Sequence, residues 1–410
     1  MRIAMRFINK VSVALVLAGF CGMALSAEET APTRFLVENV NVWDGTSDGL
    51  QLNQNVFVEG KFINAIGRNM EVADNTIVID GGGRVLIPGI IEAHTHLSVP
   101  VPLLEVRDKE WMYLGALSAR EAEKMLMRGW TTARDMGGPT QGLAQAIDEG
   151  RIIGPRIYTS AMFISQTSGH GDFRSYNEPH PNMGGGANPW GQSYSLIADG
   201  PAEVKRAVRE SLRRGATQIK IMAGGGISSE YDPVDTHQYS LEELRAAVEA
   251  ADEWNTYVAA HAYTDQAARK ALEAGVKVIE HGHMLSEDTL RLLKEKGAFL
   301  SPQSFAYVRV FFAGDNRSAQ TQPRPKNGMQ IVRGVDNLMR LAKELDIPVA
   351  FGTDAIGYPK AFDAAVREFG GRLKWFTSLE ILKQATSVNA QLLELTGPRN
   401  PYPDGPLGVI

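Results

Sequence analysis

The sequence has very little cysteine, no apolar run long enough to span a membrane, and no excess of positive charge. Cys21 is the one cysteine among 410 residues, so the chain cannot form an internal disulfide bond. Any metal site further along must therefore use imidazoles, carboxylates or a modified lysine. The 42 Lys and Arg residues are outnumbered by 47 Asp and Glu residues. Because nucleic-acid binding needs clustered Lys and Arg, the composition does not indicate that class of partner.

The first 27 residues have the pattern of a signal peptide. A basic start (Arg2, Arg6 and Lys10) is followed by the apolar stretch Val11–Leu25 and by small residues at its exit. This stretch is shorter than the roughly 20 residues that a membrane helix needs, although an uncleaved anchor is the alternative. Cleavage would remove three of the 42 basic residues and none of the 47 acidic ones, which moves the formal charge from −5 to −8. We therefore expect a periplasmic or secreted protein with no membrane segment after cleavage.

Two patterns of secondary structure divide the rest of the chain. Between Arg34 and Val85, short runs that alternate apolar and polar residues predict an antiparallel β unit. From Leu86 onward, short apolar runs alternate with amphipathic stretches, which is typical of parallel βα units in an α/β fold. The 44% of hydrophobic and 22% of charged residues fit a globular enzyme. We predict a β segment over residues 28–85 and a barrel over residues 86–395.

Eight apolar runs are candidate barrel strands, a number that suggests a (β/α)8 barrel. They are Leu86–His94, Thr131–Asp135, Arg156–Ala161, Gln218–Ala223, Tyr257–Ala262, Lys277–Glu280, Ala298–Pro302 and Pro348–Gly352. Predicted helices between them include Ala202–Arg214, Leu241–Trp254, Asp265–Ala274 and Gln330–Leu345. Two stretches, Pro181–Ser195 and Ala313–Gly328, are predicted as long loops, which in a compact barrel are usually lids or binding loops.

The motif "IPGIIEAHTHLS" carries the strongest chemical signal in the sequence. A buried apolar strand ends there in His94 and His96. Residues i and i+2 of a strand face the same side, so both imidazoles point inward. Two convergent imidazoles predict a metal site. The alternative, a polar pair on an exposed sheet edge, disagrees with the apolar run that precedes them.

Four further residues fall in or at the ends of later predicted strands. Lys220 lies inside the apolar strand "TQIKIMAGGG", where an unpaired ammonium is costly unless it is chemically changed. His261 and His281 end their strands, and Asp354 ends "PVAFGTDA". Each residue alone could be structural, as a hydrogen-bonded histidine, a paired lysine or a turn aspartate. Together they predict an active site, because such barrels place theirs at the carboxyl ends of the strands.

The order His-x-His, Lys, His, His, Asp resembles the amidohydrolase superfamily of metal-dependent hydrolases. The segments "ISQTSGHGD", "IKIMAGGG", "AAHAYT", "IEHGH" and "FGTDA" resemble the group labelled Xaa-Pro dipeptidases. That group includes carboxypeptidase-like enzymes acting on dipeptides and N-acyl amino acids, and hydrolases of ochratoxin A. The resemblance runs from about Phe35 to the C-terminus. It implies a TIM barrel with a small β-sandwich formed mainly from the N-terminal segment.

The resemblance also implies a ligand set for two zinc ions, with other divalent metals as alternatives. His94, His96 and Asp354 would hold the first ion, and His261 and His281 the second. Carbon dioxide would carbamylate Lys220, which would then bridge both ions. A bridging hydroxide would attack the amide carbonyl, and Asp354 would pass its proton to the leaving amine.

Several residues are expected near the substrate. His170 in "TSGHGD" and Tyr263 in "AAHAYT" match family positions that lie near the substrate, so either could hydrogen-bond the carbonyl oxygen or the substrate carboxylate. Pocket candidates with weaker support are Ser98, Tyr231 and His283, and Arg309 is one candidate partner for a carboxylate. The alternative for each is a structural role. His180 and His237 lie in predicted loops, where solvated side chains are expected.

Residues 396–410 are expected to begin a C-terminal return to the β-sandwich. Family members continue past "PDGPLGVI", so the segment reads as truncated at Ile410. The resemblance further implies a homo-oligomer, with an octamer as one form, and a small peptide or N-acyl amino acid as substrate.

The predicted function is a binuclear zinc amidohydrolase that releases a C-terminal, hydrophobic or aromatic amino acid from dipeptides or N-acyl amino acids, with ochratoxin A as a candidate substrate. Three alternatives stay open. The first is a proline-releasing Xaa-Pro dipeptidase. The second is a mononuclear deaminase or cyclic-amide hydrolase of the same fold. The third is a non-catalytic periplasmic binding protein.

Overall fold

The computed structural model describes residues 33–185, 193–304 and 329–410. The expected signal peptide, Arg309 and the predicted loop Ala313–Gly328 lie outside these residues, as does the centre of the predicted loop Pro181–Ser195. Within the described ranges, no helix combines the length and the apolar character that crossing a membrane requires.

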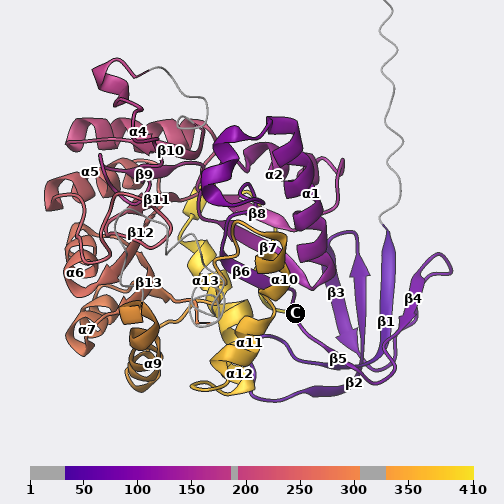
Figure 1. Cartoon of the computed structure of the whole chain (residues 1–410). Coiled ribbons are helices and arrows are strands. Elements are labelled where there is room, and N and C mark those ends of the chain that lie inside the picture. The colour runs from indigo at the N-terminus through magenta and orange to yellow at the C-terminus, as the bar shows by residue number, and fades with distance from the viewer. Residues whose placement is uncertain (1–32, 186–192, 305–328) are drawn as a thin grey trace, which may run out of the picture.

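The N-terminal residues form a five-stranded mixed sheet beside the larger α/β body (Figure 1). Its strands are β1 (Arg34–Val42), β2 (Gln51–Glu59), β3 (Phe62–Gly67), β4 (Ile77–Asp80) and β5 (Val85–Leu86). β1, β2 and β3 pair antiparallel, whereas β4 and β5 pair parallel with β1. The prediction of an antiparallel unit is therefore wrong for β4 and β5. Residues 68–76 lead the chain back across the sheet before β4 begins, and strand alternation carries no information about direction.

A ring of parallel strands forms the core of the α/β body and confirms the predicted barrel class. Its regular strands are β6 (Ile90–Thr95), β7 (Trp130–Asp135), β8 (Arg156–Thr159), β11 (Ile219–Met222), β12 (Val258–Thr264), β13 (Val278–Met284) and β14 (Phe299–Ser301). The eighth position is filled by residues 348–354. The strand predicted there, Pro348–Gly352, does not form a regular one. They bond to β14 through Ala350 N and Leu300 O at 2.8 Å, and to β6 through Asp354 N and His94 O at 2.7 Å. These bonds close the ring.

The third barrel strand is predicted to run from Arg156 to Ala161, but in the structure it is interrupted after Thr159. Ala161 has a left-handed backbone with φ 57°. The chain then resumes as β9 (Phe163–Ser165), which pairs with β11 and with β10 (Ser195–Ile197). At the break, Thr217 N donates to Thr159 O at 2.8 Å and keeps the third and fourth strands together.

Helices cover the outside of the ring (Figure 1). They are α1 (Trp111–Met127), α2 (Gln141–Asp148), α4 (Pro201–Arg213), α5 (Leu241–Asp252), α6 (Asp265–Ala274), α7 (Glu287–Glu295), α9 (Met329–Glu344), α10 (Pro359–Ala364), α11 (Arg367–Arg372), α12 (Ser378–Lys383) and α13 (Asn389–Glu394). Short helical turns are η1 (Leu103–Asp108), η2 (Pro181–Met183), η4 (Gln384–Val388) and η5 (Gly397–Arg399). The four predicted helices agree with α4, α5, α6 and α9 within two residues at each end.

Local signals account for the bounds of α6, which match the prediction. The Thr264 side chain accepts a hydrogen bond from Ala267 N and caps the first turn. Gly275 ends the helix with φ 104°, a conformation that favours glycine. Ala267, Ala268 and Ala271 are buried between these caps, so the small residues let α6 pack closely on the barrel.

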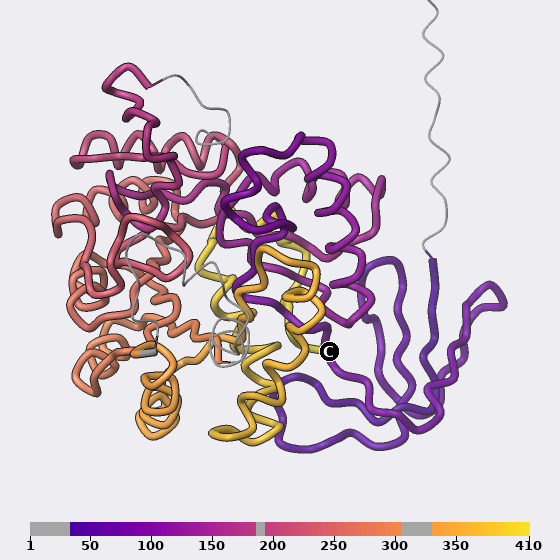
Figure 2. Tube along the Cα trace, in the orientation of Figure 1, coloured from indigo at the N-terminus to yellow at the C-terminus, as the bar shows by residue number. Residues whose placement is uncertain are grey.

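The last residues of the chain lie beside the N-terminal sheet (Figure 2). Ile410 N donates to Asp44 O at 3.1 Å, and the Ile410 side chain packs against the small core formed by Val40, Val42 and Val56. The domain boundaries at residues 86 and 395 stay predictions.

Candidate metal centre

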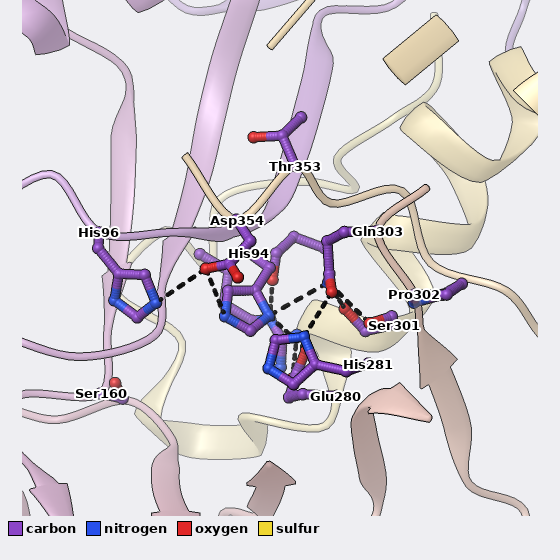
Figure 3. A network of polar contacts seen from close by, with 12 residues as sticks. His94, His96, Ser160, Glu280, His281, Ser301, Pro302, Gln303, Thr353 and Asp354 are labelled. Carbon is purple, nitrogen blue, oxygen red and sulfur yellow. Dashed lines mark hydrogen bonds and ion pairs between the residues drawn. The ribbon is translucent and has the colours of Figure 1, made fainter. Parts of the chain in front are cut away.

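Two imidazoles and one carboxylate converge where β6 ends and the closing segment 348–354 turns away (Figure 3). His94 Nε2 lies 3.6 Å from Asp354 Oδ1, and His96 Nε2 lies 3.4 Å from the same oxygen. The ligand atoms of all three residues lie within 4.8 Å of one another. Asp354 has φ 54°, a backbone turn that brings its carboxylate over the strand ends.

These three residues fit a divalent metal ion. His94 Nε2 is buried and has no hydrogen-bond partner among the described residues, although it faces the Asp354 carboxylate. A buried polar atom without a partner is costly, and an imidazole nitrogen directed at a carboxylate is a suitable metal ligand. His94, His96 and Asp354 therefore form a candidate metal site.

The other nitrogen of His94 is held by a buried charge pair that the sequence reasoning missed. His94 Nδ1 donates to Glu280 Oε2 at 2.7 Å, and Arg134 Nη2 donates to Glu280 Oε1 at 2.6 Å. Burial raises the pKa of Glu280, but Arg134 and His94 outweigh it and hold that pKa below its ordinary value. The carboxylate thus fixes the proton of His94 on Nδ1 and leaves Nε2 free to bind metal. The sequence does carry a signal for Glu280, because a glutamate inside the apolar run "VIEHGH" needs a buried partner.

His96 and His281 are oriented in the same manner. His96 Nδ1 donates to Gly137 O at 3.1 Å. His281 Nδ1 donates to Gln303 Oε1 at 2.7 Å, and Gln303 is anchored through its Nε2 to Ser301 O at 2.7 Å (Figure 3). Both histidines therefore present Nε2 to the centre. Gln303 was also missed, because it follows a strand end without any distinctive motif.

Lys220, His261 and His281 form a second buried group next to the first. The rings of His261 and His281 are 4.6 Å apart, and those of His281 and His94 are 5.1 Å apart. Burial lowers the pKa of Lys220 to about 8, against the opposing effect of Glu280 and Asp354. The structure therefore brings the lysine predicted to be unusual into the electrostatic range of both groups.

Low pKa values keep the clustered imidazoles neutral. Burial, followed by the Lys220 ammonium, lowers the pKa of His94 to about 4. Burial also places the pKa values of His261 and His281 well below the ordinary range, and their charged neighbours add to the effect. Neutral imidazoles carry the lone pairs that bind metals, so these three rings each have a lone pair available near neutral pH.

His170 and Tyr263 both lie against His261. The His170 ring stacks on the His261 ring with centroids 4.1 Å apart, and the Tyr263 ring meets it at 4.8 Å. His170 Nδ1 donates to Ser229 Oγ at 2.7 Å and to Asp232 Oδ2 at 3.1 Å. The structure thus places both predicted substrate residues at the edge of the second group. Ser229 and Asp232 were not anticipated from the sequence.

The weaker pocket candidates are less closely connected to the centre. His283 is buried, stacks on Tyr263 at 5.7 Å and donates from Nε2 to Gln303 O at 3.0 Å. Ser98 is buried, and its carbonyl accepts from the Tyr194 hydroxyl at 2.8 Å. Tyr231 is partly exposed, and its carbonyl accepts from Ser168 Oγ at 3.3 Å. The roles of all three stay predictions.

The two loop histidines differ from each other. His237 is exposed, as expected. His180 is not solvated, since its side chain is only 12% exposed. Its Nδ1 accepts from Asn182 N at 3.1 Å and caps η2, and its Nε2 lies 3.6 Å from Asp199 Oδ2. The expectation for His180 is therefore wrong, because local contacts hold the ring against the protein.

Solved structures of known proteins match this architecture over most of its length. A prolidase solved with N-methylphosphonate-L-proline superposes with a TM-score of 0.83 at 32% identity, covering 92% of this chain and 90% of that one. A Xaa-Pro dipeptidase with methionine bound in its active site superposes with a TM-score of 0.76 at 26% identity, covering 92% and 91%.

Sequence comparison leads to the same group. Ochratoxinase from Aspergillus niger is 35% identical over 303 residues, which are 70% of this chain and 59% of that protein. The chain thus matches about three fifths of the length of this relative. Residues 85–397 of this chain match the model of the amidohydrolase family. With its barrel, its His-x-His strand end and this match over most of its length, the chain belongs to the amidohydrolase family.

Proposed function

We propose that this amidohydrolase is a binuclear zinc enzyme that hydrolyses an amide bond to release a C-terminal amino acid. Its substrates would be dipeptides or N-acyl amino acids with a hydrophobic or aromatic leaving residue, ochratoxin A included. The observation that carries the proposal is the buried meeting of His94, His96 and Asp354 with the second group of Lys220, His261 and His281.

The two groups would divide the metal ions between them. His94, His96 and Asp354 would hold one zinc ion, and His261 and His281 the other. When bound, the pair would supply a water of lowered pKa and a Lewis acid for the scissile carbonyl. The donor set contains no thiolate, and neutral imidazoles with carboxylates suit zinc.

Lys220 would supply the missing negative charge as a carbamate. With its pKa lowered to about 8, about a tenth of the amine is neutral at pH 7. The neutral nitrogen forms a bond to the carbon of carbon dioxide and loses a proton, which leaves a carboxylate at the end of the side chain. This change would remove a buried cation from a site that has to accommodate two more.

The remaining residues would handle the substrate and its protons. Burial raises the pKa of Asp354, but His94, His96 and Lys220 lower it overall. Its carboxylate is therefore ionised near neutral pH, so it could accept a proton and later donate it to the leaving amine. Tyr263 and His170 lie against His261. The Tyr263 O–H could hold the carbonyl oxygen or the substrate carboxylate, and His170 could do so through Nε2 when its ring carries a second proton opposite Asp232.

The relatives support the substrate class and also a second candidate. Ochratoxinase is 35% identical, which supports an N-acyl amino acid as substrate. The prolidase solved with N-methylphosphonate-L-proline superposes with a TM-score of 0.83, against 0.76 for the crystal structure of A. niger ochratoxinase. That match favours the release of proline as the second candidate function.

A steady-state screen of the zinc-loaded enzyme would test the proposal. The substrates are Xaa-Phe, Xaa-Leu, Xaa-Pro and Xaa-Arg dipeptides, N-acyl-phenylalanines and ochratoxin A, with metal content measured on the same preparation. We expect about two zinc ions per chain and preferred release of Phe or Leu. Preferred Xaa-Pro cleavage would select the second candidate. A single metal with release of ammonia would indicate a deaminase, and binding without turnover would indicate a binding protein; either result would refute the proposal.

A further inference from the structure

Glu92 lies fully buried in β6, two residues before His94. Its Oε1 accepts hydrogen bonds from two backbone amides, His94 N at 2.9 Å and Thr353 N at 2.9 Å. The first amide belongs to one proposed metal ligand, and the second belongs to the residue before Asp354. Thr353 and both ligands lie together in Figure 3. One carboxyl oxygen therefore joins the two segments that carry the first metal group.

The backbone needs this side-chain acceptor because β6 is irregular at that point. Its pairing register with β7 shifts between Glu92 and Thr95. On its other side β6 meets the closing segment 348–354, which does not form a regular strand. Buried amides in native proteins nearly always have an acceptor. Where the regular ladder is interrupted, the Glu92 side chain provides that acceptor for both amides.

The contact between β6 and the closing segment 348–354 is called the seam below. The spacing of the proposed metal ligands depends on it. His94 Nε2 and Asp354 Oδ1, 3.6 Å apart, come from segments whose backbones meet through Asp354 N and His94 O at 2.7 Å. The seam is tight, since a Cβ on Gly352 would lie 2.8 Å from the Cβ of His94. A displaced amide at either His94 or Thr353 would therefore change the ligand distance.

We propose that Glu92 is a positioning residue for the metal centre, holding His94 and Asp354 in register across the seam that closes the barrel. This inference rests on the proposed metal-dependent function. Glu92 is not one of the three residues whose ligand atoms converge, and it would act through the backbone amides of His94 and Thr353.

Asn389 provides a matched control on the same seam. It is fully buried, its Oδ1 accepts from Phe351 N at 2.9 Å, and its Nδ2 donates to Ile91 O at 2.7 Å. Asn389 thus joins the same two segments further from the ligand side chains. If loosening the seam were sufficient to disturb the metal, Asn389→Leu would weaken metal binding as much as a Glu92 variant.

The test compares the full-length variants Glu92→Gln, Glu92→Asp, Glu92→Met and Asn389→Leu as metal-free proteins. Zinc affinity is measured by competition with a chromophoric chelator, and the melting temperature is measured in EDTA. Glu92→Gln keeps an oxygen at the Oε1 position and should bind zinc within about threefold of wild type. Glu92→Asp withdraws the acceptor by one methylene, and Glu92→Met removes it. Both should bind zinc about 10- to 100-fold more weakly, the effect typical of supporting groups around a metal.

The outcomes separate the inference from the proposed function. Asn389→Leu should lower the melting temperature but leave zinc affinity within about threefold of wild type. If Glu92→Met fails to fold, Glu92→Asp decides the question alone. Wild-type affinity in Glu92→Asp, or an equal loss in Asn389→Leu, would overturn the role of Glu92 while the metal site stands. A wild-type protein that binds no metal would overturn both.

Discussion

Replacing Glu280 with glutamine should weaken metal binding by reversing the proton position on His94. The wild-type carboxylate accepts from His94 Nδ1 at 2.7 Å and from Arg134 Nη2 at 2.6 Å. Glutamine has only one oxygen, and the Arg134 guanidinium, which is always a donor, will claim it. The amide NH2 then faces His94 Nδ1. That nitrogen must become an acceptor, so the proton moves to Nε2, the atom directed at the metal site.

The magnitude follows from two separable effects. Groups that orient a metal-binding histidine typically contribute about 10- to 100-fold to metal affinity. Breaking a buried ion pair from one side typically costs about 3–5 kcal/mol, but glutamine keeps one hydrogen bond to Arg134 and should cost less. Glu280→Leu leaves the Arg134 charge buried and unpaired, so it should show the full loss of stability as well as the loss of zinc affinity.

Zinc titration and denaturant unfolding of the metal-free protein would measure the two effects separately. The double variant Arg134→Leu/Glu280→Leu is the control, because removing both charges should recover much of the stability without restoring zinc affinity. If Glu280→Gln binds zinc as tightly as wild type, the Glu280 carboxylate does not set the His94 tautomer and the reasoning fails.

Four further changes test other parts of the site and the core. Lys220→Ala should abolish hydrolysis, and acetate or propionate should restore part of it by supplying a carboxylate; full activity without added acid would exclude a carbamate. Asp232→Ala removes the charged one of the two acceptors of His170 Nδ1 and leaves Ser229 Oγ, so it should lower kcat/KM about tenfold, the loss of one charge-assisted hydrogen bond, with unchanged metal content. Tyr263→Phe should lower kcat on the order of a hundredfold if its hydroxyl stabilises developing charge; an unchanged kcat would make it a packing residue. Leu300→Ala, at a fully buried barrel position, should cost about 2–5 kcal/mol in denaturant unfolding, and a loss under 1 kcal/mol would contradict the core described above.

Features that depend on neighbouring residues could be predicted from the sequence. The alternation of a strand places His94 and His96 on one face, and an apolar run made β6 recognisable. The bounds of α6 follow from its Thr264 cap and from Gly275 at its end. The same logic identified Lys220 as unusual, because a cation inside an apolar strand needs an explanation wherever that strand lies.

Other features depend on pairings between distant residues, and only the tertiary structure decided them. Glu280 is 186 positions from His94, and the Thr353 amide is 261 positions from Glu92. β4 joined β1 in parallel although its sequence pattern fits either direction. Side-chain periodicity records which face of an element is buried, whereas the orientation of a buried carboxylate depends on which strands close the barrel beside it. The residue types of the candidate metal centre are therefore visible along the chain, but their supporting hydrogen bonds exist only once the ring of strands has closed.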